Sequence, residues 1–144
     1  MNKTSYEDEL ERTGVVFSTT VGKSMEPMLV ERETAVVIKK AKGLLKKYDV
    51  VLFRRKGGEY VLHRIIKVRE KDYIICGDSC TEKEQVLHEQ VIGVVTGYYK
   101  NGRLIPMSDR RYRLYVRFRC AVLPIRTGRA LLRTALRKLR KKHH

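Results

Sequence analysis

The stretch that decides the fold is residues 59–76, which read EYVLHRIIKVREKDYIIC. Val, Ile and Tyr dominate both ends of this stretch, and the charged run at 69–72 separates them. β-Branched and aromatic residues favour extended backbone, and a short polar run between two such segments is typical of a turn between strands. We therefore expect one strand over residues 59–68, a turn near Lys71-Asp72, and a second strand over residues 72–76.

The same pattern continues along the chain in both directions. Glycine and asparagine punctuate it at positions that favour turns, among them Gly57-Gly58, Gly77-Asp78 and Asn101-Gly102, the last being a strong hairpin signal. Further strands are expected over residues 14–20, 34–39, 49–54, 90–99 and 103–107. Short strands at this spacing predict a mainly β, compact and barrel-like domain.

Two helical segments flank the predicted β domain. Thr4 and Glu7 have capping-box spacing, which favours a short helix that Gly14 would end. Near the C-terminus, apolar residues repeat on one helical face and arginines on the other, which predicts a basic amphipathic helix. These apolar residues are Leu131, Leu132, Ala135, Leu136 and Leu139. We expect a β domain over residues 1–107 and a basic amphipathic extension over 108–144; the structural type of residues 112–122 stays open.

Charge is concentrated in that extension. The chain of 144 residues has a net charge of +16, and from Asp109 onward it contains thirteen Lys or Arg and one acid. Without this segment the net charge falls to about +4, so the basicity belongs mainly to the tail. Three interpretations stay open: the leucine face packs on the β domain, residues 127–142 bind an anionic membrane surface, or the helix binds nucleic acid. The last is the least favoured, because no helix-turn-helix pattern is visible.

The cysteine content and the hydropathy of the sequence limit the functions to be considered. The three cysteines give no disulfide framework, and Cys76 and Cys80 lack the second pair of ligands that a zinc site needs. We expect no metal and no cofactor. No apolar run approaches the ~20 residues that span a bilayer, which favours a cytoplasmic protein, with peripheral association at the inner face of the membrane as the alternative.

Ser24 and His63 are the candidate catalytic pair. A serine hydroxyl needs a nearby base to become a nucleophile, and an imidazole with a pKa of about 6.5 can take its proton near neutral pH. Ser24 lies between a predicted strand and a turn at Pro27, and its own amide N–H is placed to stabilise an oxyanion. Taken singly, each residue has a plainer interpretation: Ser24 as an ordinary loop serine, and His63 as a hydrogen-bonded core histidine.

Asp78 is the natural third member, because a carboxylate can orient the imidazole and stabilise its charged form. An Asx-type turn explains Asp78 equally well. Strand alternation places His63 on one face with Val61 and Ile65, opposite Arg64.

The order of segments adds a more specific signal. Five segments resemble, in order, the motifs of type I signal peptidases and cover residues 15–100. They are Gly22-Lys23-Ser24-Met25-Glu26-Pro27, Tyr48-Asp49-Val50-Val51-Leu52-Phe53, Tyr60-Val61-Leu62-His63-Arg64, Gly77-Asp78-Ser79 and Val91-Ile92-Gly93-Val94-Val95.

The resemblance implies a signal-peptidase/LexA-like peptidase fold of the S24/S26 type and a Ser24/His63 dyad like that of the family's serine-histidine branch. Gly22, two residues before the nucleophile, would let a substrate backbone approach closely, so we expect Gly22 and Met25 at the substrate and oxyanion side of Ser24. Lys67, four residues after His63, is a rival base on the same predicted face. Tyr48 replaces the usual glycine, and the segment after Asp78 lacks the usual aspartates. The acidic partner of His63 is therefore open among Asp78, Glu82 and Glu84.

These observations predict a serine endopeptidase that cleaves a peptide or precursor protein. Because family members that process exported proteins carry a membrane anchor and no such segment is visible in this sequence, the exported substrate is not carried over. The alternative is a catalytically inactive peptidase-like domain that binds peptides or acts as a regulatory module.

Overall fold

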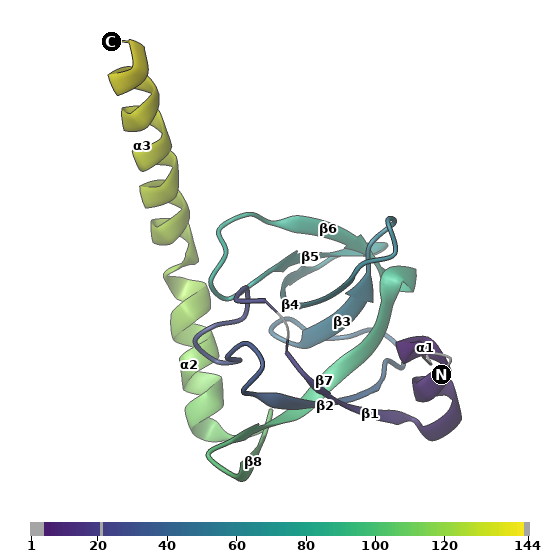
Figure 1. The fold of residues 1–144 in the computed structure, drawn as a ribbon. Coiled ribbons are helices and arrows are strands. Elements are labelled where there is room, and N and C mark those ends of the chain that lie inside the picture. Colours follow the sequence, from purple (N-terminus) through teal and green to yellow (C-terminus); the bar gives the residue numbers. More distant parts are fainter. Residues whose placement is uncertain (1–4, 21, 143–144) are drawn as a thin grey trace.

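Strands rich in Val and Ile form one antiparallel sheet in the computed structural model, which describes residues 5–20 and 22–142 (Figure 1). The strand order is β1-β2-β7-β3-β4-β5-β6, and β8 pairs with β7. The strands are β1 (Val15–Thr19), β2 (Ala35–Lys40), β3 (Val50–Arg54), β4 (Tyr60–Val68), β5 (Asp72–Cys76), β6 (Glu84–Leu87), β7 (Val91–Lys100) and β8 (Arg103–Pro106).

The predicted mainly β architecture with a short N-terminal helix and a C-terminal helix is confirmed. The sheet is open rather than closed into a barrel: β1 and β6 end its main strand order, and no pairing joins them within the described residues. β6 was not predicted from the sequence. It is only four residues long and pairs with β5, with Glu84 opposite Ile75.

The centre of the sheet is buried on both sides. Along β3, Val50 and Leu52 belong to one apolar cluster, while Val51 and Phe53 belong to another. This alternation follows from the two-residue period of a strand. The first cluster is covered by α1, by the Met25–Leu29 loop segment and by α2, whereas the second consists of strand residues and Leu45.

The N-terminal helix, α1 (Tyr6–Thr13), covers one part of the first cluster through Leu10, which is buried. Its N-cap is Ser5, whose hydroxyl accepts a hydrogen bond of 3.2 Å from the Asp8 amide. The capping box expected at Thr4 lies outside the described residues. Gly14 ends the helix at φ +77°, a conformation that favours glycine.

Two helices form the basic extension, α2 (Arg110–Ala121) and α3 (Leu123–Lys142). A 3-10 turn, η1 (His88–Gln90), lies earlier in the chain, between β6 and β7. Asp109 caps α2 by accepting a hydrogen bond of 3.0 Å from the Tyr112 amide. Tyr112 and Val116 then bury α2 in the first core cluster.

α3 continues from α2 and projects away from the sheet (Figure 1). Its leucine face does not pack on the β domain, so that interpretation of the sequence is wrong: Leu123 is the only buried residue of α3, and Leu131, Leu132, Leu136 and Leu139 are exposed by 53–67%. The helix still contacts the domain at Leu123 and Arg126 but has left it before Leu131. Among the described residues, no helix combines the length and the hydropathy needed to cross a bilayer.

Candidate active site

Ser24 lies in the loop between β1 and β2, at a turn that the core anchors on one side. Met25, Met28 and Leu29 are almost fully buried in the first cluster, whereas Ser24 stays half-buried. These buried side chains therefore anchor the loop to the core, while Ser24 remains near the surface.

The turn at Gly77–Cys80 holds the Ser24 backbone from a second side. The Ser79 amide donates to the Ser24 carbonyl at 2.9 Å, and the Ser79 hydroxyl donates to the Lys23 carbonyl at 2.6 Å. A Cβ on Gly77 would lie 2.6 Å from the Ser24 carbonyl oxygen, which is closer than real contacts allow. Glycine at position 77 is therefore what permits the turn and the serine loop to approach so closely.

His63 lies in β4, where it pairs with Val51 of β3. Its side chain is buried, and its ring meets Phe53 edge-to-face with centroids 6.0 Å apart. Val61 and Ile65 contribute to the same second cluster, which confirms the alternation expected along this strand. The Nδ1 atom of His63 is buried and has no hydrogen-bond partner among the described residues.

Burial lowers the pKa of His63 below its ordinary value, because desolvation disfavours the charged imidazolium. The charge of Glu84 opposes this effect, and that of Arg55 adds to it. At neutral pH the ring is therefore neutral, which is the form that accepts a proton.

Two recesses lie beside β4. One, of about 270 Å³, is lined by Gly22, Ser24 and Met25 together with Leu62. The other, of about 580 Å³, is lined by His63 and by residues 79–84. Ser79 lines the second recess and binds the Ser24 carbonyl, so the two recesses are neighbours. Within the part of the chain that the structure describes, no hydrogen bond joins the Ser24 hydroxyl to His63.

The two residues expected at the substrate side differ in their surroundings. Gly22 is exposed, adopts φ +88°, and donates its amide N–H to a carboxylate oxygen of Glu31 at 3.1 Å. Met25 is 3% exposed and serves mainly as a core anchor, although it also borders the first recess. Gly22 thus offers open backbone next to the serine, whereas Met25 offers little surface to a substrate.

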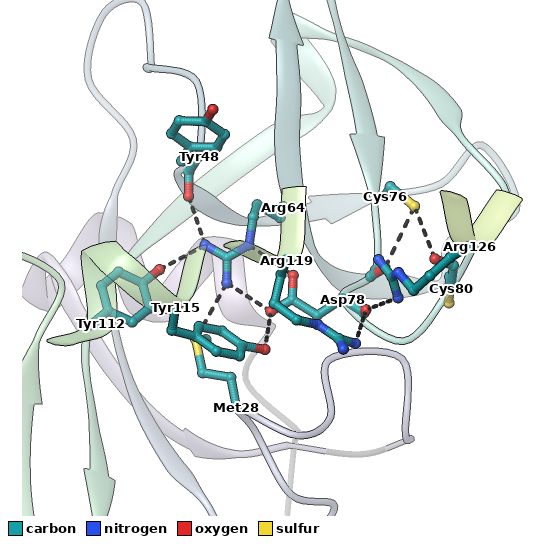
Figure 2. Close-up of polar contacts among 11 residues, drawn as sticks. Met28, Tyr48, Arg64, Cys76, Asp78, Cys80, Tyr112, Tyr115, Arg119 and Arg126 are labelled. Carbon is teal, nitrogen blue, oxygen red and sulfur yellow. Dashed lines mark hydrogen bonds and ion pairs between the residues drawn. The ribbon is translucent and has the colours of Figure 1, made fainter. Parts of the chain in front are cut away.

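Asp78 makes no hydrogen bond with His63; its carboxylate binds Arg64 instead (Figure 2). The Nε and Nη2 atoms of Arg64 donate to the two oxygens of Asp78 at 2.7 and 2.8 Å, and the Tyr115 hydroxyl donates to one of them at 3.0 Å. The reason is the alternation of β4, which sends Arg64 to the face opposite His63, where Asp78 lies.

Arg64 is the most heavily bonded side chain of this region. Its side chain is 1% exposed, and besides Asp78 it donates to the Tyr48 carbonyl at 2.9 Å, to the Tyr112 hydroxyl at 2.8 Å and to the Met28 sulfur at 3.3 Å. Tyr48 itself has φ +80°, in the region where glycine is favoured. This is the position at which the resemblance implies a glycine, and a glycine would adopt this φ without strain.

The backbone of Asp78 also connects the turn to the helical extension. Its carbonyl oxygen accepts hydrogen bonds of 2.6 Å from Arg119 of α2 and from Arg126 of α3 (Figure 2). Burial raises the pKa of the Tyr115 hydroxyl, and the neighbouring Asp78 charge raises it further. One turn therefore bridges the serine loop and both C-terminal helices.

The other two candidate acids lie on the His63 side. Glu84 pairs with Arg55 through two hydrogen bonds of 2.9 and 2.8 Å, which hold the pKa of Glu84 below its usual value. Glu82 is exposed and borders the recess that contains His63. Of the three acids, Glu84 is the one whose charge acts most strongly on His63.

Lys67 is not on the His63 face, contrary to the prediction. The pairing of β4 with β5 shifts between Ile65 and Lys67, because Ile66 is an extra residue opposite the β5 ladder. This bulge reverses the alternation, so Val68 joins the second cluster and Lys67 is exposed. Lys67 is thereby removed as a rival base.

Sequence reasoning missed the network around Asp78. Arg64, Tyr115, Arg119 and Arg126 come from three elements that no local pattern connects. One signal was present: an arginine on the inward face of a mostly apolar strand needs a buried acid, since such a charge is almost never buried unpaired. The sequence matches no protein-family model and no curated protein.

Proposed function

We propose that the protein is a serine endopeptidase of the signal-peptidase type, in which Ser24 is the nucleophile and His63 its general base. The observation that carries the proposal is the state of His63: a buried, neutral histidine whose Nδ1 atom has no partner among the described residues, in a recess also lined by Ser79, whose amide and hydroxyl hold the Ser24 loop. Buried polar atoms without partners are uncommon in folded proteins and call for an explanation.

The chemistry follows the usual acyl-transfer sequence. Ser24 attacks the scissile carbonyl while His63 accepts the hydroxyl proton, and His63 then gives that proton to the leaving amine. Water hydrolyses the acyl-serine in a second round of the same proton transfers. Ser24 and His63 need to approach one another only in the substrate complex, since catalytic hydrogen bonds are often long in free enzymes.

A substrate would enter beside Ser24 as an extended peptide. β1 is an edge of the sheet, and its residues Ser18 and Thr19 border the same recess as Ser24. An added strand can pair with such an edge through main-chain hydrogen bonds and place alternate side chains in the recess.

The test is cleavage of a peptide library followed by mass spectrometry. We expect Ser24→Ala and His63→Gln each to lower kcat by about 10³-fold or more, while peptide binding persists. Ser108→Ala, which changes an exposed serine outside both recesses, is the matched control and should cleave at the wild-type rate. Turnover that survives in both the Ser24 and the His63 variants would contradict the assignment.

A second candidate function is a peptide-binding or regulatory module without catalysis. Its support is the engagement of Asp78 with Arg64, which leaves His63 without a hydrogen-bonded carboxylate among the described residues. In that case the wild type and Ser24→Ala would bind the same peptides with equal affinity, and neither would cleave them.

A further inference from the structure

The C-terminal helices expose a row of large apolar side chains that nothing in the fold covers. We call this row the helix stripe; it consists of Leu114, Phe118, Ile125, Leu132, Leu136 and Leu139. Each member is between 53% and 68% exposed. Water-exposed leucines occur singly on many proteins, but an ordered row of six is unusual on a free surface.

The stripe is continuous across the two helices. Only Val122 separates α2 from α3, and its amide bonds the Phe118 carbonyl while its carbonyl accepts from the Arg126 amide, so helical hydrogen bonding passes through the junction. At 3.6 residues per turn, the six side chains fall within an arc of about 60° over a length of about 38 Å.

The same geometry points the stripe away from the β domain. Tyr112, Val116 and Leu123 are the buried residues of the two helices, and helical spacing places them on the side opposite the stripe. The domain therefore does not obstruct a flat surface that approaches along the stripe (Figure 1).

The charge of the two helices indicates which kind of surface the stripe would bind. From residue 110 to 142 the chain carries thirteen Lys or Arg and no Asp or Glu, and Arg129, Arg133 and Arg140 lie next to the stripe on the helix surface. Arginines beside an apolar face suit a bilayer interface, where leucines enter the acyl boundary and guanidinium groups meet anionic head groups.

Two other occupants fit less well. A second copy of the chain would bring two such cationic segments together, and their repulsion opposes pairing along the stripe. Nucleic acid would neutralise the arginines but leave the six apolar side chains in water.

We propose that the helix stripe docks on an anionic bilayer surface, with α2 and α3 lying along it and the β domain facing the aqueous side. This interaction does not depend on Ser24, and it extends along both helices rather than being limited to residues 127–142.

The test is flotation of the full chain with vesicles of phosphatidylcholine alone or mixed with phosphatidylglycerol. We expect binding to the mixed vesicles that falls about tenfold or more in Leu132→Gln/Leu136→Gln, because two exposed apolar anchors are lost. Thr134→Gln, an exposed position off the stripe, is the matched control and should bind like the wild type. Arg133→Gln/Arg137→Gln should also weaken binding about tenfold or more, and neutral vesicles should bind poorly.

Three results would overturn the proposal. Equal flotation of the wild type and the double leucine variant would exclude the stripe. If the wild type does not float but forms a dimer at the assay concentration, and the leucine substitutions dissociate that dimer, the stripe binds a second copy of the chain. If the wild type does not float but binds labelled duplex DNA, and this binding is lost in the arginine variant and kept in the leucine variant, the helices bind nucleic acid.

Discussion

His63 and Arg64 are neighbours in β4, yet their side chains lie on opposite faces of that strand and differ in their hydrogen bonding. On one face Arg64 is buried and donates five hydrogen bonds. On the other face His63 is also buried, but its Nδ1 atom has no partner among the described residues. A fully bonded group is fixed and contributes to the fold, whereas a group with an open position can take part in chemistry. The comparison separates the structural role of Arg64 from the catalytic role that we propose for His63, one residue away.

The largest effect is expected on the Arg64 face. Asp78→Asn should lower the free energy of unfolding by about 3–5 kcal/mol, because it leaves the Arg64 charge buried without its counter-charge. Chemical denaturation measures this loss. Glu84→Gln breaks a more exposed ion pair with Arg55, and we expect it to cost about 1 kcal/mol or less. If both substitutions cost the same small amount, Arg64 is not fixed as the structure shows.

An intermediate effect is expected where the turn meets the serine loop. Gly77→Ala should destabilise the protein by about 1–3 kcal/mol, because its Cβ would overlap the Ser24 carbonyl and force the turn and the loop apart. Gly57→Ala places a Cβ in open space and is the matched control, with an expected change within about 0.5 kcal/mol. Thermal unfolding of the two variants compares them directly; equal stability would show that the contact at Gly77 is not tight.

The smallest effect concerns the protonation of His63. Burial lowers its pKa, so peptidase activity should rise with pH through a midpoint below that of an ordinary histidine and stay high at neutral pH. Glu84→Gln should move this midpoint further down, because it removes a charge that raises the pKa of His63 and frees the opposing charge of Arg55. NMR titration of the imidazole measures the midpoint even where turnover is slow.

Glu82→Gln is the control for this titration, since Glu82 borders the same recess but does not contribute to the pKa shift of His63. A midpoint that rises in Glu84→Gln, or that moves equally in both variants, would contradict the electrostatic picture of this face.

Most of the sheet could be predicted because each strand carries its own signal. Alternating Val and Ile residues set the strands to within about one residue at most ends, and alternation also assigned His63 and Arg64 to opposite faces. β6 could not be predicted because its four residues begin with Glu and Gln and carry little apolar pattern. Its stability comes from pairing with β5. The type of α2 stayed open because arginines interrupt its apolar positions.

The site was less predictable because its contacts are long-range. The bulge at Ile66 changes which face Lys67 occupies, and such an insertion is visible only against the partner strand. Similarly, Asp78 lies 14 residues from Arg64 and 37 from Tyr115, so only the folded chain shows that they meet. The resemblance to signal peptidases predicted Ser24 and His63 but not this network.

The carbonyl of Asp78, bonded by Arg119 and Arg126, has a thermodynamic consequence. Because Ser79 of the same turn holds the Ser24 backbone, the helices and the serine loop are coupled through a single peptide segment. Coupling of this kind is reciprocal. If a peptide binds at Ser24 as proposed, a ligand on the helices that changes the strength of the two arginine bonds would change the affinity for that peptide by some factor, and the bound peptide would change the affinity of the helices for that ligand by the same factor.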